Sequence, residues 1–508
     1  MMKSRPFRSL LCLLLAAFFG SASAQYAFLT PDYDALGPRY EVRAAWLTTL
    51  SGLDWPRTRG EAAQKAELCR MLDALQQTGV NVVLLQTRVR GTVIYPSALE
   101  PWDACLSGSA GKPAWDALAF AVDECHRRGM ELHAWVVCFP IGKTRAVAAL
   151  GKQSLPARRP ELCRRAGDEW LMNPGVPATA DYLAALCSEM VARYDIDGVH
   201  LDYIRYPERG IPFDDASTFR RYGRGSLRAW RTANVTRCVE RIYSAVKRLK
   251  PWVKLSCSPV GKYADLPRQS SMGWNARDAV FQEAQEWLRR GQMDWLLPMM
   301  YFDGQHFYPF AADWQAEASG RVVAPGLGIY LLDKREKDWS LAQVTRQLSY
   351  LRRLGCGGAA FFRTRFLLDN QKGLRDFLAD EFYARRCLTP PLTWQDSVPP
   401  SRPALRLTPG EKSVRLSWTP STDDSGLPVR YNIYRHPTDT AFDARRARLV
   451  AVRLDTTVYE HRPALPSARY GLFAVTAVDR YGNESAPAVV VRRPSARVLP
   501  HGTKKTPR

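Results

Sequence analysis

A histidine and an aspartate lie two residues apart inside an apolar stretch of the sequence, GVHLDYIRYP, which begins at Gly198. Val199 and Leu201 give this stretch the character of a buried β-strand, and residues two apart on a strand share a face. We therefore expect His200 and Asp202 to point to the same side. A carboxylate inside an apolar strand must be hydrogen-bonded or paired, and such burial also shifts the pKa of catalytic carboxylates. Asp202 is therefore the first candidate for a catalytic group.

Polar and aromatic side chains also gather near the ends of other apolar stretches. Aromatic rings stack on the apolar faces of sugars, while arginine, glutamine and aspartate side chains hold sugar hydroxyls. This combination predicts a sugar-binding cleft. The predicted substrate-binding residues are Arg43, Trp46, Gln86, Arg88, His133, Trp135, His200, Tyr203, Arg205 and Tyr301.

A glycosidase normally needs two carboxyl groups, one as the acid and one as the base or nucleophile. Glu208 follows the stretch that contains Asp202 by one residue, and Asp303 lies just beyond a later apolar stretch. Asp265 and Asp333 also follow apolar stretches. We predict a catalytic set made of Asp202 with Glu208 or Asp303, and spacing alone does not choose the partner.

Several motifs of other hydrolases are absent. The sequence has no H-E-x-x-H motif, no group of residues with metal-ligand spacing and no G-x-S-x-G motif. These absences disfavour metal-dependent hydrolysis and serine esterase chemistry. We therefore predict neither a metal nor another cofactor.

Eight apolar segments alternate with amphipathic segments along most of the chain. Such alternation predicts strand–helix units with a parallel sheet, and eight units match a (β/α)8 TIM barrel in number and size. An open, doubly wound sheet is the alternative, but no glycine-rich phosphate turn follows the first strand. The expected strands are 41–47, 81–87, 131–137, 198–204, 253–259, 293–301, 322–330 and 358–364, and the expected helices are 60–78, 115–128, 179–193, 226–249, 275–290, 309–319, 340–354 and 370–383.

The carboxyl ends of the strands carry the active site in barrels of this kind. Two connections on that side, residues 88–114 and 138–178, are long. Long loops in compact domains are usually functional. We therefore expect both loops on the face where the active site is built.

The sequence changes character after the predicted barrel of residues 38–386. Prolines mark a linker at 387–402. Residues 403–494 contain short strand-like segments, with Trp418 suited to a sandwich core, and they resemble a fibronectin type III module. The tail, 495–508, ends in HGTKKTPR, and we predict that it is disordered.

The first 24 residues have the form of a secretory signal peptide. Basic residues precede an apolar run, and small residues ending at Ala24 provide a cleavage site. The apolar run is too short to span a bilayer; an uncleaved anchor is the alternative. We predict an exported protein, periplasmic or at the cell surface, with no transmembrane segment in the mature chain.

The chain is strongly basic, with a formal net charge of +22. Lys3, Arg5 and Arg8 leave with the signal peptide, so the mature chain carries +19. Such a charge attracts anionic polymers. A nucleic-acid partner is disfavoured by export and by the lack of a nucleic-acid-binding motif, and we expect an anionic glycan instead.

Ten cysteines remain after removal of Cys12 with the signal peptide. None forms a C-x-x-C pair, which argues against a zinc ribbon or a thioredoxin-like site. Most lie in predicted helices and strands, where we expect buried thiols. Export permits disulfides, and the loop residues Cys105 and Cys163 are the best candidates for them.

Five stretches resemble one known family: RAAWL, GVNVVLLQTRVRG, LHAWV, DGVHLDYIRYP and LLPMMY. Their order is similar to that of the glycosyl-hydrolase-like family related to family ten, over about residues 38–383. The resemblance implies an exported barrel enzyme that acts on glycans, and characterised members are implied to cut peptidoglycan strands that lack stem peptides. Many members have a second aspartate where this chain has Tyr203, so that residue's role is not carried over. Asp202 matches the first aspartate.

The leading prediction is a glycoside hydrolase of bacterial cell-wall glycan. The lack of an obvious second carboxylate keeps a non-catalytic glycan-binding or scaffolding protein open. A glycosidase of another polysaccharide would share every feature described, and it also remains open.

Overall fold

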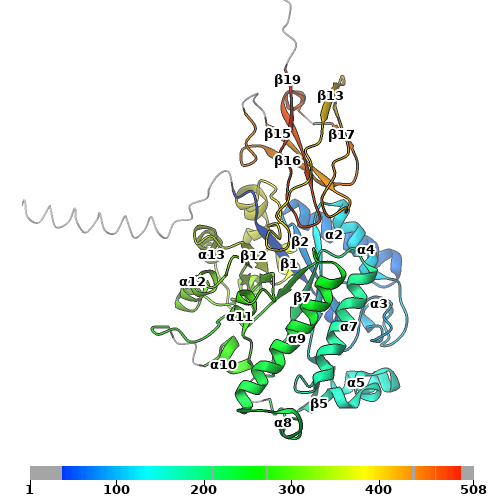
Figure 1. The fold of residues 1–508 in the computed structure, drawn as a ribbon, viewed down its shortest axis with the longest axis vertical. Coiled ribbons are helices and arrows are strands. Elements are labelled where there is room, and N and C mark those ends of the chain that lie inside the picture. The colour runs from blue at the N-terminus through cyan, green and yellow to red at the C-terminus, as the bar shows by residue number, and fades with distance from the viewer. Residues whose placement is uncertain (1–36, 209–210, 270–272, 437–440, 464, 494–508) are drawn as a thin grey trace, which may run out of the picture. The chain divides into compact units, whose positions relative to one another are not determined.

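The computed structural model describes residues 37–208, 211–269, 273–436, 441–463 and 465–493 (Figure 1). The chain forms two compact units. One runs to Ala384 and also includes Leu388–Pro390, and the other comprises Arg385–Cys387 and the chain from Pro391 onward. The predicted signal peptide and tail lie outside the described residues.

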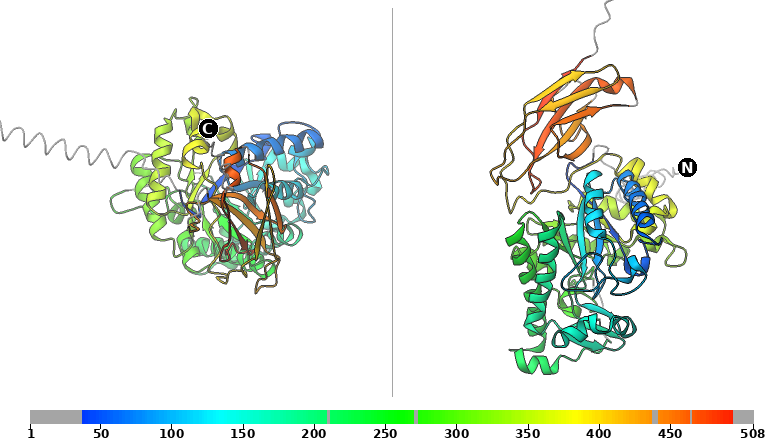
Figure 2. Two further views of the ribbon diagram at one scale, coloured as in Figure 1. Left: turned by 90° about the horizontal axis from the view of Figure 1, so that it is seen from above. Right: turned by 90° about the vertical axis from the view of Figure 1, so that its right-hand side faces the viewer.

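The first unit is built on a parallel sheet whose strands run β10-β9-β8-β7-β3-β2-β1-β12-β11 in space. Helices surround these strands, as both views show (Figure 1, Figure 2). The strands are β1 (Val42–Leu47), β2 (Val82–Arg88), β3 (Glu131–Val137), β7 (Gly198–Asp202), β8 (Lys254–Cys257), β9 (Trp295–Leu296), β10 (Val322–Val323), β11 (Gly326–Leu327) and β12 (Gly358–Phe361).

The sheet closes into a barrel because β10 and β11 are two parts of one strand. They lie at opposite ends of the spatial order, yet only Ala324 and Pro325 separate them in the chain. The Ala324 N–H donates to Leu296 O at 2.9 Å, and the Pro325 carbonyl accepts from the Ala360 N–H at 3.0 Å. Proline has no N–H to donate, so the ladder is interrupted there. Counting β10 and β11 as one strand gives eight, which confirms the predicted (β/α)8 barrel.

Most of the predicted helices are present within a few residues of their expected bounds. The expected helix 275–290 is instead two short helices, because Phe281 adopts a left-handed conformation with φ 64°. The last expected helix, 370–383, is a short α-helix followed by a π-helical turn at Leu378–Phe382. The main helices are α2 (Glu61–Gln77), α4 (Ala117–Arg127), α7 (Pro177–Arg193), α9 (Leu227–Leu249), α10 (Ala276–Val280), α11 (Ala284–Arg289), α12 (Tyr308–Ala316), α13 (Leu341–Arg353), α14 (Thr364–Leu368) and α15 (Leu374–Phe377).

The long connection 138–178 contains structure that its sequence does not indicate. Its strands β4 (Pro140–Lys143), β5 (Cys163–Ala166) and β6 (Glu169–Met172) form a small antiparallel sheet. The β5–β6 hairpin turns at Gly167, whose φ is 62°. Strands of four residues are too short for a clear alternation of apolar and polar side chains, so this segment reads as a loop. Short helices in the barrel's connections are α3 (Ala104–Ser107), α5 (Thr144–Leu150), α6 (Leu155–Arg158) and α8 (Ala216–Tyr222).

A buried ion-pair group lies at the amino-terminal end of β1. The Arg43 Nε donates to Glu41 Oε2 at 2.7 Å, and Arg352 binds the same carboxylate at 2.9 Å. The Arg43 guanidinium also lies 4.1 Å from the centre of the Tyr383 ring. Arg43 is therefore buried at the end of the barrel opposite to the predicted site, and the expectation that it binds substrate is corrected.

A second buried group lies at the start of β3. Glu131 accepts a hydrogen bond from Lys254 Nζ at 2.9 Å and contacts His133 Nε2 at 3.0 Å. His133 is fully buried and its ring lies against that of Trp295. The structure therefore places His133 near the amino end of the barrel as a partner of Glu131, and removes it from the predicted substrate-binding residues.

The segment after the last barrel helix returns to this same end. The Leu388 N–H donates to Arg39 O at 3.0 Å, and the Glu41 N–H donates to Leu388 O at 2.9 Å. The Thr389 Oγ1 donates to Glu131 Oε1 at 2.5 Å. Leu388–Pro390 thus belong to the barrel unit, although they fall inside the expected linker 387–402.

The second unit contains two antiparallel sheets, drawn in orange and red in Figure 2. Side chains such as Val414, Trp418, Ile433 and Phe473 form its core. This confirms an all-β module, and its assignment to the fibronectin type III class stays a prediction. One sheet has strands β13 (Leu405–Pro409), β14 (Val414–Trp418) and β17 (Val458–His461), and the other has β16 (Arg448–Leu454), β15 (Arg430–His436), β18 (Gly471–Val478) and β19 (Ala488–Arg492).

The ten cysteines of the described chain are all free thiols, including the predicted disulfide candidates Cys105 and Cys163. Seven of them are buried and three are partly buried. Burial raises the pKa of Cys163 to about 12 and also raises the pKa of Cys138. The cysteines therefore fill space in the core as protonated thiols.

A chain that ends at Pro390 should unfold in one cooperative transition, and a chain that ends at Ala384 should be less stable. The shorter chain loses the two backbone hydrogen bonds of Leu388 and the bond from Thr389 to Glu131. At about 1 kcal/mol net for each hydrogen bond, we expect a loss of roughly 3 kcal/mol. Urea unfolding of both chains measures the difference. Equal stabilities would show that residues 388–390 contribute nothing to the barrel.

Candidate active site

Two layers of polar side chains fill the barrel interior between β7 and its neighbours. His200 and Asp202 both face inward, as the alternation of β7 predicts, and both are buried. On β8, Ser256 lies directly opposite His200 in the parallel register. Ser258 follows two residues later on the same side. His200 and Asp202 therefore each have a serine partner at the same level of the barrel.

The deeper layer is centred on His200. The Trp46 indole N–H donates to His200 Nε2 at 3.0 Å, and His200 Nδ1 lies 2.9 Å from Ser256 Oγ. Because an indole only donates, Nε2 is the acceptor and the ring proton is on Nδ1. Burial lowers the pKa of His200 well below its usual value, and His133 lowers it further. The ring is therefore neutral, and both of its nitrogens are occupied by Trp46 and Ser256. The expectation that His200 binds substrate is corrected, because it has no free nitrogen to offer.

The upper layer is centred on Asp202. Its Oδ1 accepts from the Tyr203 N–H at 2.8 Å and from Ser258 Oγ at 3.0 Å. Its Oδ2 accepts from the Trp135 indole at 3.1 Å. Burial raises the pKa of Asp202, while Ser258, Arg205, the Tyr203 N–H and Trp135 partly oppose this effect. The carboxyl group is thus held rigidly and retains a higher proton affinity than a free aspartate, which suits proton transfer.

The chain turns sharply just after Asp202. Tyr203 has φ 50°, and its side chain is 40% exposed. The Arg205 guanidinium stacks 4.6 Å from the centre of the Tyr203 ring and lies 3.3 Å from Glu208 Oε1. The Nε of Arg205 is buried and has no hydrogen-bond partner among the described residues. Tyr203, Arg205 and Glu208 therefore form the rim beside Asp202, and binding of substrate by Tyr203 and Arg205 stays a prediction.

Aromatic rings form another wall of the site. Tyr301 stacks on Phe362, with ring centres 5.4 Å apart, and packs edge-on against Tyr330 at 5.8 Å. Burial raises the pKa of Tyr301, and the charge of Asp202 raises it further. Phe362 also packs against Trp46 at 6.0 Å. This wall is apolar on its ring faces and carries hydroxyl groups at its edges, which suits a sugar.

Two predicted substrate-binding residues hold loops instead. Gln86 Oε1 accepts from Thr48 Oγ1 at 2.5 Å and from the Thr49 N–H at 3.0 Å, so it shapes the connection after β1. Arg88 is fully buried and makes two hydrogen bonds to Glu100, at 2.7 and 2.6 Å. Another of its nitrogens donates to Cys138 O at 2.7 Å. The expectation that Arg88 binds substrate is corrected, because its donors are committed to the protein.

The candidate partners of Asp202 lie in different surroundings. Glu208 lies on the rim and contacts Arg205. Burial raises the pKa of the Tyr203 hydroxyl, and the negative charges of Asp202 and Glu208 raise it further. Asp303 is exposed and accepts from Gln343 on α13 at 2.9 Å. The structure therefore brings Glu208 and not Asp303 into the group around Asp202. Among the described residues, no three His, Cys, Asp or Glu side chains are grouped as a metal site requires.

Ser258 and Phe362 belong to the site but are not among the residues predicted from the sequence. The signal for Ser258 is its place in the expected strand 253–259, two residues after Ser256. Phe362 directly follows β12, inside the expected strand 358–364. Neither a serine nor a phenylalanine in an apolar strand is distinctive, so only the register of neighbouring strands reveals their roles.

Comparison with known proteins identifies related chains. The family model described as "Glycosyl hydrolase-like 10" matches residues 41–331. Glycosyl hydrolase YngK of Bacillus subtilis is 30% identical over 474 residues, which cover 88% of this chain and 92% of that protein. Glycosyl hydrolase DigH of Escherichia coli is 30% identical over 340 residues, 59% of this chain and 76% of that protein. Among solved structures, α-L-fucosidase isoenzyme 2 from Paenibacillus thiaminolyticus has 15% identity and a TM-score of 0.46, covering 68% of this chain and 49% of that one.

Below about pH 6.5, the wild-type chain should lose stability that a His200→Gln chain does not lose. The pKa of His200 is held well below 6.5 in the folded state. As the pH falls through this value, the unfolded chain takes up a proton that the folded chain excludes, so the free energy of unfolding decreases. One such proton corresponds to about 1.4 kcal/mol per pH unit.

Urea unfolding of both chains between about pH 7.5 and 5.5 measures this difference. At the higher pH the variant should be less stable than the wild type, because it loses the two well-placed hydrogen bonds of the His200 ring. The free energy of unfolding of the variant should nevertheless depend less on pH. The same pH dependence in both chains would show that His200 is not the group that resists protonation.

Proposed function

The chain belongs to the glycosyl hydrolase-like 10 family and is a glycoside hydrolase, and we propose that it is exported and cleaves the glycan strands of bacterial peptidoglycan. The observation that carries the catalytic part of this proposal is the buried carboxyl group of Asp202 beside a wall of aromatic rings. The positive charge of the chain supports an anionic glycan as substrate.

Asp202 is the proposed group that acts directly on the glycosidic bond. A carboxylate has about four acceptor positions, and three donors already point at Asp202. The remaining position, on Oδ2, is left for the substrate. Because the donors also fix the orientation of the carboxyl group, no side-chain rearrangement is needed when a proton moves between Asp202 and the substrate.

Glu208 is the proposed second carboxyl group. In glycosidases one carboxyl group gives a proton to the leaving oxygen, and the other activates water or attacks the sugar carbon. Glu208 lies on the exposed side of Arg205, from which a side chain can reach a bound sugar. The buried Nε of Arg205 and the ring of Tyr203 complete the proposed contacts to the sugar hydroxyls and ring faces.

Export is part of the proposal and rests on the sequence of residues 1–24. No helix among the described residues is both long and apolar enough to cross a bilayer. Export would bring the enzyme into the compartment where the polymeric wall glycan lies. Such glycan carries carboxylate groups when its peptides are removed, which matches the charge of +19 expected for the mature chain.

Mass analysis of products tests the substrate. The chain from residue 25 is incubated with purified peptide-free wall glycan, and in parallel with chitin and mannan oligosaccharides. We expect shortened oligosaccharides from the wall glycan alone. Cleavage of chitin or mannan without cleavage of wall glycan would identify a glycosidase of another polysaccharide and contradict the proposal.

Substitution of the acidic residues tests the catalytic assignment. Asp202→Asn and Glu208→Gln should each reduce kcat by roughly 10²-fold or more, because each removes a proton-transfer or nucleophilic group. Asp303→Asn is the matched control and should stay within about threefold of wild type, since the Asp303 carboxylate is exposed and accepts from Gln343 outside the group around Asp202. The rate of product formation measures all three. If Asp303→Asn lost most of its kcat while Glu208→Gln stayed active, Asp303 and not Glu208 would be the second carboxyl group.

A further inference from the structure

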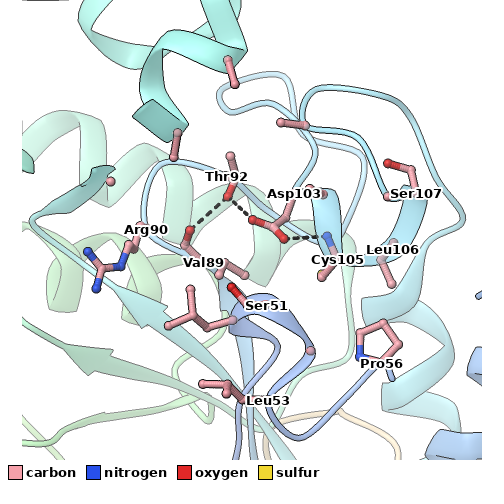
Figure 3. A pocket seen from close by; sticks show the side chains of 18 of the residues that line it. Ser51, Leu53, Pro56, Val89, Arg90, Thr92, Asp103, Cys105, Leu106 and Ser107 are labelled. Atoms are coloured by element: carbon pink, nitrogen blue, oxygen red, sulfur yellow. Dashed lines mark hydrogen bonds between the residues drawn. The ribbon is translucent and has the colours of Figure 1, made fainter. Parts of the chain in front are cut away.

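A pocket of about 840 Å³ lies on the carboxyl side of the barrel, apart from the group around Asp202. Three connections enclose it: the one after β1, the one after β2 and the start of the segment after β3 (Figure 3). In Figure 3, Ser51, Leu53 and Pro56 lie in the lower part of the view, and Thr92 and Asp103 lie above them. The volume is that of a typical small-ligand site.

The pocket and the candidate active site are linked through the start of the segment after β3. The Phe139 N–H donates to Tyr203 O at 3.4 Å, and Ile141, two residues after Phe139, lines the pocket. Arg90 also lines the pocket and pairs with Glu169 at 3.0 Å. One wall of the pocket therefore comes from the connection that contacts Tyr203, the rim residue beside Asp202.

Cationic side chains outnumber carboxylates in the pocket wall. Four cationic side chains line it, against the single carboxylate of Asp103. Asp103 is occupied, since it accepts from Thr92 Oγ1 at 2.6 Å and from the Cys105 N–H at 2.8 Å. Besides Arg90, the cationic side chains are Arg57, Arg59 and Lys143, which are exposed and make no ion pair with any described residue.

Apart from Ser51, the larger polar side chains of the wall are already hydrogen-bonded within the protein. Gln64 Nε2 donates to Thr58 O and Leu106 O, at 3.2 and 3.0 Å, and its Oε1 accepts from the Trp115 indole. The Thr58 hydroxyl donates to Glu67 at 2.9 Å. What the wall offers to a ligand is therefore mainly positive charge.

The rest of the lining is aliphatic. Leu50, Leu53, Val89, Ile141 and Leu150 face the pocket, and Leu53 is 47% exposed. No aromatic side chain is among the described residues that line it. A sugar ring that stacks flat on a protein prefers an aromatic face. This lining fits an aliphatic group that ends in a carboxylate better than it fits a sugar ring.

We propose that this pocket binds a carboxylate-bearing aliphatic substituent of the glycan, at a sugar some distance along the strand from the bond that Asp202 acts on. This inference rests on the proposed function, because it requires a glycan bound at Asp202. Arg57, Arg59 and Lys143 neutralise the carboxylate, and the leucine and isoleucine side chains contact the aliphatic part. Binding energy from this remote group holds the strand in register, so the pocket contributes to substrate selection.

The test compares two double variants that change the net charge equally. In Arg57→Glu/Arg59→Glu the change lies in the pocket, and in Arg220→Glu/Arg221→Glu it lies on α8, where both arginines are exposed and have no carboxylate partner among the described residues. The substrates are peptide-free wall glycan strands and the same strands after chemical reduction of their carboxylates to alcohols.

The pocket variant should raise KM for the untreated strands by roughly tenfold, with kcat within about twofold of wild type, because attraction becomes repulsion. For the reduced strands, the KM of the pocket variant should equal that of the wild type. The α8 variant should stay near wild type with both substrates. The milder Arg57→Gln/Arg59→Gln chain should show a smaller increase in the same direction, which guards against a folding defect in the glutamate variant.

An equal increase in KM for both substrates, or for both double variants, would overturn the inference. The dissociation constant of untreated strands is measured in parallel by calorimetry in an Asp202→Asn background, where catalysis does not interfere. If the wild type cleaves no wall glycan, the proposed substrate fails. An unchanged dissociation constant in the pocket variant overturns the pocket assignment, whatever the outcome for catalysis.

Discussion

The burial of one carboxyl group at the end of β7 constrains much of this site. Asp202 is tolerated inside the barrel only because Ser258, Trp135 and the Tyr203 N–H all donate to it. Each donor comes from a different part of the chain: the residue just after β8, β3, and the turn after β7 itself. Removing any of them leaves a buried carboxylate short of a partner, which costs more than an ordinary hydrogen bond contributes.

The need for hydrogen-bond partners also applies to the buried polar groups between Asp202 and the amino end of the barrel. Below Asp202, His200 is satisfied by Trp46 and Ser256, and the amino end is closed by glutamates paired with cations. The barrel interior around β7 is therefore a stack of polar groups in which His200 and Asp202 have specific partners, while the buried His133 Nδ1 and Trp295 Nε1 have none among the described residues. The hydrogen bonds to His200 and Asp202 make this part of the interior rigid, and a rigid support is what a catalytic carboxyl group needs to keep its orientation.

The sequence predicts the barrel well and the site in part, for identifiable physical reasons. Alternation within β7 is local, so it correctly orients His200 and Asp202. The partner of His200 is not local, because it depends on which residue of β8 lies opposite. The amino-end positions of Arg43 and His133 follow from where β1 and β3 begin, and strand ends are the least certain part of any pattern. The sequence shows the proline at position 325, but it does not show that this proline divides one strand into β10 and β11.

The free thiols described above carry a consequence for how the chain reaches its fold. Outside the cytoplasm, oxidants convert accessible thiolates into disulfides, and ten cysteines can pair wrongly in very many ways. The folded barrel resists this, because burial holds thiols such as Cys138 and Cys163 in the protonated, unreactive form. The unfolded chain has no such protection. For the proposed exported chain, barrel closure therefore competes in time with oxidation of the exposed thiols, so the rate of folding matters as well as the final stability.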